Sequence, residues 1–211
     1  MQIVRPQMKA EYSKNVFINC PFDEMYLAIF RAVVFTVYDC GYDARCALEV
    51  SDSSEVRIDK TLRIISECKY GINDISRTEL DKGTGLPRFN MPLELGMFLG
   101  AKRFGDEVQR EKSCLILDKE PYRYQGFISD IAGQDIQSHK NDISNAIRIV
   151  RNWLRSGSGR IIIPGGTEII KRYHKFISEL PLICKGLKLT IDEMTFNDFT
   201  DIVSEWLKQN P

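Results

Sequence analysis

One glutamate has both the residue type and the neighbours that glycoside chemistry needs. Glu94 lies four positions after Asn90 in the run Asn90-Met-Pro-Leu-Glu-Leu-Gly96. With Asn90 as the N-cap of a helix, Glu94 ends the first turn, where the positive end of the helix dipole favours an ionised carboxylate. A fixed anion beside a sugar C1′ stabilises an oxocarbenium-like transition state or acts as a nucleophile. The alternative is an ordinary first-turn acid without a chemical role.

Polar side chains also follow the first predicted strand, in Asn19-Cys-Pro-Phe-Asp23. Phe22 is suited to stacking on a base, and Asn19 or Asp23 to bonding a ribose hydroxyl. The alternative is a plain strand end, with Asp23 as the N-cap of the next helix and Phe22 as a hydrophobic staple.

Two further segments offer groups that bind phosphate or ribose. Ser54 and Arg57 open a helix, and hydroxyls, free N–H groups and a guanidinium at a helix start are typical of phosphate sites. An ordinary capped helix with an exposed Arg57 explains the same residues. Asp74 ends a strand and is a candidate for holding a ribose or a leaving group. His139 and His174 lie outside these loops, and we expect both at the surface.

Composition narrows the classes of partner. The 29 basic and 29 acidic residues cancel, so charge gives no reason to expect a nucleic-acid polymer or a membrane surface. The longest apolar run, Met25 to Tyr38, contains Arg31 and is shorter than the roughly 20 residues that span a bilayer. The N-terminus has no signal-peptide core. Six scattered cysteines and two histidines predict no metal site, and we expect a cytoplasmic protein with reduced thiols.

Strand and helix patterns alternate along most of the chain, which predicts an α/β fold with a parallel sheet and helices on both faces. The expected strands are 15–19, 42–49, 70–75, 113–118 and 134–138. The expected helices are 24–39, 55–68, 90–102, 122–132, 142–154, 167–180 and 195–208. We divide the chain into a polar leader (1–14), an α/β domain (15–156) and a helical C-terminal extension (157–211), with a flexible joint at 156–159.

Side-chain spacing predicts which faces of two helices are covered. Ile58, Leu62 and Ile65 fall on one face of the helix at 55–68 and are expected to be buried. Gly96 and Gly100 form a small-xxx-small face, which we expect to let their helix approach the sheet closely. Ligands bind at the carboxyl ends of parallel strands, so the loops there should carry the site.

Three motifs, in this order, resemble the nucleoside 2-deoxyribosyltransferase-like and bacterial TIR-like superfamily. They are Val16-Phe-Ile-Asn-Cys-Pro-Phe-Asp23, Asp74-Ile-Ser76 and Asn90-x-x-x-Glu94-Leu-Gly96. The resemblance implies a flavodoxin-like sheet and cleavage of N-glycosidic bonds of nucleotides or NAD, with Glu94 as the catalytic carboxylate. The implied substrate-binding residues are Asn19, Cys20, Pro21, Phe22, Asp23, Ser54, Arg57, Asp74, Ser76 and Asn90.

The resemblance also implies how such a protein would work. NAD or a nucleotide is the substrate, no cofactor is needed, and the role is that of a bacterial antiviral-defence effector or signalling enzyme. Its activity would depend on a homo-oligomer or an activating protein partner. Deoxyribosyltransferases carry an Asp-x-Gly-Thr element just before the glutamate, where this chain has Pro87-Arg-Phe-Asn90. A deoxyribosyltransferase, a non-catalytic module that binds a nucleotide signal, and an interaction protein with a vestigial pocket remain the alternatives.

Overall fold

The computed structural model describes residues 11–50, 52, 54–80, 83, 85–157 and 162–211. Five strands form one sheet in the order β2-β1-β3-β4-β5, and every neighbouring pair is parallel. The strands are β1 (Asn15–Asn19), β2 (Asp43–Arg45), β3 (Tyr70–Asp74), β4 (Ser113–Asp118) and β5 (Ile136–Ser138). This is the flavodoxin-like order, and it confirms the predicted α/β class.

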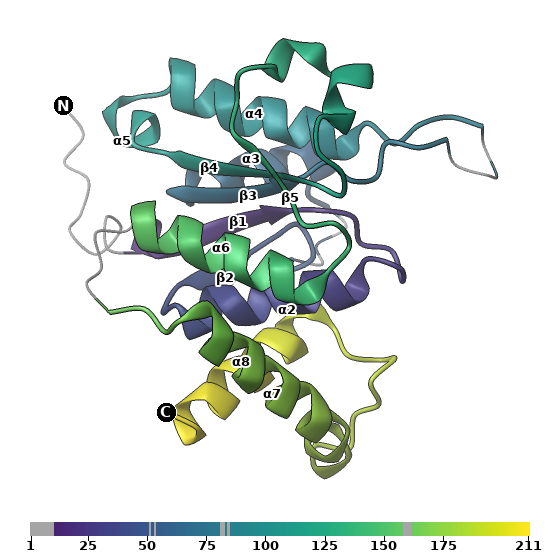
Figure 1. The fold of residues 1–211 in the computed structure, drawn as a ribbon, viewed down its shortest axis with the longest axis vertical. Helices are drawn as coiled ribbons and strands as arrows, with labels where there is room; N and C mark the ends of the chain where they lie inside the picture. Colours follow the sequence, from purple (N-terminus) through teal and green to yellow (C-terminus); the bar gives the residue numbers. More distant parts are fainter. Residues whose placement is uncertain (1–10, 51, 53, 81–82, 84, 158–161) are drawn as a thin grey trace.

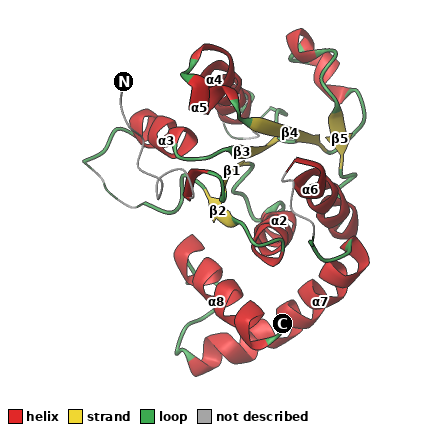
Figure 2. Cartoon of the chain, turned by 90° about the vertical axis from the view of Figure 1, so that its left-hand side faces the viewer, coloured by secondary structure: helices red, strands yellow, loops and turns green. Residues whose placement is uncertain are grey.

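Helices cover both faces of the sheet, as predicted. Their bounds are α2 (Leu27–Asp39), α3 (Arg57–Ser66), α4 (Asn90–Phe104), α5 (Glu107–Arg110), α6 (Ile143–Gly157), α7 (Gly166–Gly186) and α8 (Phe196–Gln209). Figure 1 shows the sheet between two helical layers, and Figure 2 shows α3, α4 and α5 on one face with α2 and α6 on the other. The helices α7 and α8 form a further layer outside α2 (Figure 2).

Four predicted elements differ clearly from the observed ones. The helix predicted at 167–180 continues to Gly186 as α7, with Pro181 inside it. β2 ends at Arg45 because a turn follows, in which the Glu49 N–H donates to the Cys46 carbonyl. α2 starts at Leu27, since Asp23 caps a separate turn by accepting the Tyr26 N–H. The segment predicted as a helix at 122–132 contains two short 3-10 helices, Arg123–Gly126 and Ser129–Ile131, because Tyr122 and Ile128 leave the helical backbone region.

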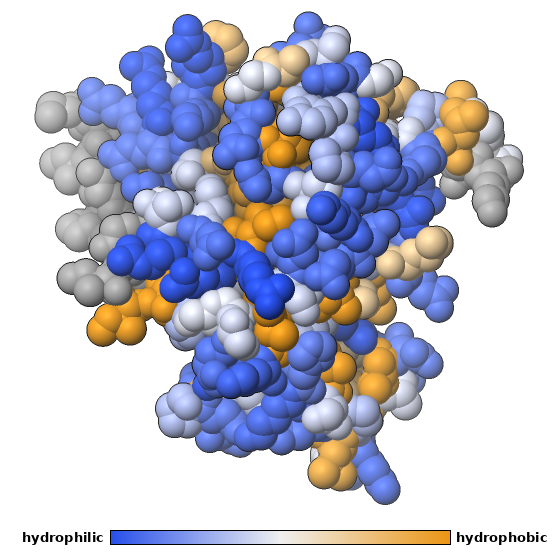
Figure 3. Space-filling model, in the orientation of Figure 1, coloured by the Kyte–Doolittle hydropathy of each residue, from blue (hydrophilic) through white to orange (hydrophobic). Residues whose placement is uncertain are grey.

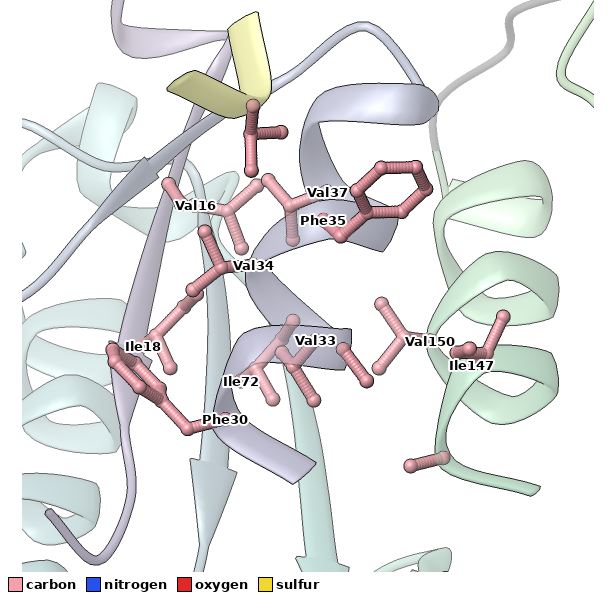
Figure 4. Close-up of a cluster of buried hydrophobic side chains, with 14 of the residues drawn as sticks. Val16, Ile18, Phe30, Val33, Val34, Phe35, Val37, Ile72, Ile147 and Val150 are labelled. Atoms are coloured by element: carbon pink, nitrogen blue, oxygen red, sulfur yellow. The ribbon is translucent and has the colours of Figure 1, made fainter. Parts of the chain in front are cut away.

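The main core lies between the sheet and α2. The side chains of Val33, Val34 and Val37 on α2 are buried, and Figure 4 shows them among residues of β1, β3 and α6. The expectation that this apolar helix is deeply covered is therefore confirmed.

The C-terminal helices share this core. Phe35 of α2 stacks on Phe176 of α7 with centroids 5.3 Å apart, and it also contacts Tyr173 of α7 and Trp206 of α8. The predicted Thr195–Asp198 capping box opens α8. From the predicted leader, Tyr12 is buried and its hydroxyl donates to the Val108 carbonyl. Residues 1–10, and residues 158 and 159 of the predicted joint, lie outside the described residues.

The other face of the sheet has a smaller core, and it corrects the predicted stripe on α3. Ile65 is buried as expected, but Ile58 and Leu62 are each 45% exposed. The buried positions are Thr61, Ile64 and Ile65. The reason is that α3 packs sideways on Phe98 of α4 and Phe17 of β1, which lie toward the 61/64/65 side of the helix.

The glycines that permit close packing are also not the predicted ones. A Cβ placed on Gly96 or Gly100 would meet nothing within 4 Å, so these glycines do not bring α4 to the sheet. A Cβ on Gly71 of β3 would instead lie 2.6 Å from the Phe98 ring. That ring is fully buried and stacks on Phe17, with centroids 6.3 Å apart.

The substitution Gly71→Ala is therefore expected to destabilise the protein by about 1–3 kcal/mol, because the trapped Phe98 ring cannot move away from the new methyl group. Gly100→Ala is the matched control. In an open helix position it should raise the free energy of unfolding by roughly 0.5–1 kcal/mol. Urea denaturation of both variants measures the difference. A destabilising Gly100→Ala with a neutral Gly71→Ala would support the prediction that the glycines of α4 make the close approach to the sheet.

A buried lysine fixes the end of α3. The Lys112 side chain is 1% exposed, and its Nζ donates to the carbonyls of Ile65 and Cys68, the former at 2.6 Å. The ammonium lies 4.8 Å from the centre of the Phe98 ring. Burial lowers the pKa of Lys112 to about 8. Lys112 thus links α3 to α4, the two helices between which the predicted glutamate lies.

Candidate functional site

Three hollows lined by described residues at the carboxyl ends of the strands each contain at least one predicted site residue. The first, here called the Glu94 pocket, lies between α3 and α4 and has a volume of about 190 Å³. The second, the edge cavity, lies at the starts of α2 and α6 and measures about 330 Å³. The third, the loop groove, of about 650 Å³, adjoins the edge cavity, since Met25 and Arg77 line both.

The Glu94 pocket brings together three of the predicted residues. Its described lining consists of Arg57, Ile58 and Thr61 from α3 and Asn90, Leu93, Glu94 and Met97 from α4. The walls are mostly apolar because the exposed Ile58 and Leu93 face it, which accounts for two hydrophobic side chains outside the core.

The start of α4 differs from the prediction in one respect. Asn90 is the first helical residue and Phe89 is the N-cap, which offers no side-chain hydrogen bond. Glu94 consequently lies just beyond the first turn, where the helix dipole has weakened. Burial raises the pKa of Glu94, and the nearby positive charge of Arg57 partly opposes that rise. The expectation that the helix dipole keeps Glu94 ionised is thus replaced by a balance between burial and Arg57.

Ser54 does not share this pocket with Arg57. Its N–H and its hydroxyl both donate to the Asp52 carboxylate, at 2.9 and 2.7 Å. These bonds lower the pKa of Asp52. The N–H and hydroxyl that we expected to hold a phosphate already bind an anion of the chain itself.

Asn19 and Cys20 are buried at the end of β1. The Asn19 amide donates to Asn73 Oδ1 at 3.1 Å and to the Met91 carbonyl at 2.8 Å. Asn19 thus ties β1 to β3 and to the first turn of α4, which positions Glu94. Burial raises the pKa of the Cys20 thiol well above its usual value, and the charges of Asp74 and Glu94 add to this.

The rest of that loop faces α2. Pro21 is buried, and Phe22 is 40% exposed with its ring edge-on to Phe30, at 5.4 Å between centroids. Asp23 accepts a hydrogen bond from Arg77 at 2.8 Å, in addition to the Tyr26 N–H. Asp23 lines the loop groove. Pro21, Phe22 and Asp23 are all outside the described lining of the Glu94 pocket.

Asp74 and Ser76 belong to a buried polar cluster, which we call the Asp74 cluster. Asp74 accepts from the Tyr26 hydroxyl at 2.7 Å and from the Ser76 N–H at 2.8 Å. His139 Nε2 lies 3.0 Å from Asp74 Oδ2 and 2.9 Å from Ser76 Oγ. All of these side chains are less than 5% exposed. His139 is thus buried, and its predicted surface location is wrong.

The Asp74 cluster contains the residue types of a catalytic triad but cannot work as one. The N–H of Asn141 donates to His139 Nδ1 at 3.1 Å, so Nδ1 carries the lone pair and the proton of the neutral ring resides on Nε2. A triad needs the lone pair on the nitrogen that faces the serine. His139 therefore donates to Asp74 and Ser76 and holds the ends of β3 and β5 together.

Arg123 anchors the loop that follows β3. Its guanidinium donates to Asp118 Oδ1, to Thr78 Oγ1 and to the Ile75 carbonyl, at 2.8, 2.9 and 2.7 Å. Burial raises the pKa of Asp118, and Arg123 opposes this. Arg123 was not predicted as a site residue, because it follows a strand that sequence patterns do not link to the loop after β3.

Within the described residues, no group of three or more His, Cys, Asp or Glu side chains is placed to hold a metal ion. No described helix has the length and apolarity that crossing a membrane requires. All six cysteines are free thiols. Comparison with protein-family models and with curated proteins finds no match to this chain.

Proposed function

We propose that this chain cleaves the N-glycosidic bond of NAD or a related nucleotide, with Glu94 as the carboxylate facing the ribosyl C1′. The observation that carries the proposal is the composition of the Glu94 pocket. Its described lining holds one carboxylate (Glu94) and one guanidinium (Arg57), with the neutral polar Thr61 and Asn90 and the apolar Ile58, Leu93 and Met97 around them. The order of the three motifs that resemble the deoxyribosyltransferase-like and TIR-like superfamily supports the same chemistry.

The pocket suits one part of a nucleotide rather than the whole. Its volume of about 190 Å³ is below the roughly 300 Å³ at which sites for whole small molecules begin. Ile58, Leu93 and Met97 offer apolar contact to a base or nicotinamide ring. The ribose then lies near Glu94, and the phosphates extend toward solvent past Arg57.

The reaction needs little beyond a well-placed negative charge. The C1′–N bond breaks and its electron pair stays on the ring nitrogen. Water adds its oxygen to C1′ and releases a proton to solvent. An ionised Glu94 stabilises the positive charge that develops on the ribosyl ring. Nicotinamide leaves as a neutral ring from a cationic one, so the departing base requires no general acid.

A panel of NAD, ribonucleotides and deoxynucleotides, incubated with the full chain at several protein concentrations, tests the proposal. Chromatography should detect free base or nicotinamide. Transfer of the sugar to an added base without hydrolysis would identify a deoxyribosyltransferase. The same panel in a thermal-shift assay covers the second candidate function, a non-catalytic module.

That second candidate has one observation in its favour. The polar side chains of Asn19, Asp74 and Ser76 are hydrogen-bonded within the chain itself rather than aimed at the Glu94 pocket. Nucleotides that raise the melting temperature without losing their base would favour this module. We also propose a role in antiviral defence and a dependence of activity on assembly. Both rest on the family resemblance.

The opposing effects of burial and of Arg57 on the pKa of Glu94 predict how activity depends on pH. Arg57 lowers the pKa of Glu94 against the effect of burial, so Arg57→Gln should let that pKa rise further. Because the ionised carboxylate is the active form, the acidic limb of the kcat/KM profile should move to higher pH, by roughly half to one unit. Arg63→Gln, on the exposed side of α3, is the control and should leave the limb in place. A shift toward lower pH would contradict the predicted sign.

A further inference from the structure

The edge cavity lies on the opposite face of the sheet from the Glu94 pocket. It is bordered by the start of α2, by the loop after β3, by the residue after β4 and by the start of α6. The Glu94 pocket is formed by α3 and α4, and the two described linings have no residue in common. Figures 1 and 2 show these two pairs of helices on opposite sides of the strands. A ligand of the edge cavity would therefore be bound independently of Glu94.

The charged side chains in the described lining of the edge cavity are cations. Arg77 and Lys119 are among its described lining residues, and no carboxylate is. Arg77 pairs with Asp23, and Lys119 pairs with Glu79, but both carboxylates lie on the side of the loop groove. These partly exposed ion pairs hold the two cations at the rim. Such pairs are weak, so an anion with several acceptor oxygens can compete with each single carboxylate.

Backbone donors at the start of α2 add to this charge. No side chain caps α2. The Leu27 N–H donates to the Glu24 carbonyl of the preceding turn at 3.3 Å, and the N–H groups that come next at a helix start have no acceptor within the helix. Ala28 and Ile29, both in this first turn, line the edge cavity. A helix start of this kind favours phosphate, and here it faces the same hollow as the two cations.

A buried hydroxyl adds a polar group to the edge cavity. Ser76 is 2% exposed and lines the edge cavity. Because His139 Nε2 carries the ring proton, it donates to Ser76 Oγ at 2.9 Å, and the hydroxyl oxygen acts as the acceptor. With this tautomer, the Ser76 hydroxyl keeps its own proton for a further hydrogen bond, which an oxygen of a ligand in the cavity would accept.

We propose that the edge cavity binds a small phosphate monoester, of the size of a sugar phosphate. The phosphate lies between Arg77, Lys119 and the first turn of α2, and an oxygen of the ligand accepts from Ser76. The volume of about 330 Å³ lies at the lower end of small-molecule sites, which begin at roughly 300 Å³. Figure 3 shows one face of the molecule, on which hydrophilic residues predominate and hydrophobic ones form separate groups.

Isothermal titration of the full chain with ribose 5-phosphate, inorganic phosphate and ribose tests this proposal. Ribose 5-phosphate should bind, inorganic phosphate should bind more weakly, and ribose should not bind. Equal affinity for ribose 5-phosphate and inorganic phosphate would reduce the site to a simple anion site and overturn the sugar-phosphate assignment. Absence of binding by ribose 5-phosphate at millimolar concentration would overturn the proposal altogether.

Variants then locate the site. Arg77→Gln and Lys119→Gln should each weaken binding of ribose 5-phosphate by on the order of tenfold. Glu79→Gln, which frees Lys119, should strengthen it. Lys185→Gln, exposed on α7, is the matched control and should leave the affinity unchanged, as should Glu94→Gln. Equal affinity in the Arg77 and Lys119 variants and in wild type would overturn the assignment. Since Glu94→Gln tests the proposed function, the two hypotheses fail separately.

Discussion

Glu94→Gln is expected to abolish base release, lowering kcat by about a thousandfold or more. Glutamine keeps the shape of the side chain, but it replaces one acceptor oxygen with an NH2 donor and removes the charge. The ribosyl ring then develops its positive charge beside a neutral amide, and the transition state loses its electrostatic stabilisation. The size of the loss is typical of removing one preorganised charge that faces the charge of the transition state.

The same substitution should leave the fold intact. Burial raises the pKa of Glu94, which means that the folded protein disfavours the charged form. A neutral glutamine avoids that penalty, so the melting temperature of Glu94→Gln should equal or exceed that of wild type. Glu107→Gln, exposed on α5, is the matched control for turnover. Base release by Glu94→Gln at the wild-type rate would remove Glu94 from the mechanism, while the fold and the edge cavity would be unaffected.

The sequence predicts the fold best where a short apolar run is bounded by residues that end it. β1 and β4 have the predicted bounds, since each is a buried run closed by a polar residue. β2 is shorter than predicted because apolar residues continue past it into a turn. Composition alone does not separate a buried turn from a buried strand.

Faces of helices are harder to predict, because they depend on where one large side chain lies. Phe98 decides which side of α3 is buried and which glycine must lack a Cβ. The periodicity of α3 admits two neighbouring stripes, and the position of a ring on another helix selects between them. This is why Ile58 faces a pocket and Leu62 is exposed, and why Gly71, not Gly96, makes the close approach.

The sequence predicts only part of the candidate site, namely the part that follows from the order of the strands. Glu94, Asn90 and Arg57 come together because α3 and α4 are neighbours on one face, which follows from strand order in a flavodoxin-like sheet. His139 was missed although it directly follows β5, the kind of position that identified Asp74. Its contact with Ser76 joins residues 63 apart in the sequence. That contact depends on β5 being the edge strand beside β4, which no local pattern encodes.

His139→Ala is expected to cost about 3–4 kcal/mol of stability, the second large effect that the structure predicts. The substitution leaves Asp74 Oδ2 with one partner fewer, removes the donor to Ser76 and strips the Asn141 N–H of its acceptor. All of this occurs in a buried site, where water does not replace the lost bonds freely. The free energy of unfolding from urea denaturation measures the loss.

The chain provides its own control, because it contains two histidines. His174 is exposed on α7, so His174→Ala should change stability by less than about 0.5 kcal/mol. His139→Gln separates the contributions further. Its amide can still donate to Asp74 and Ser76 but cannot accept from Asn141, so it should recover about half of the loss. Equal stabilities of the two alanine variants would place His139 at the surface after all. A glutamine variant as unstable as alanine would mean that the Asn141 bond, rather than the link to Asp74, holds the end of β5 in place.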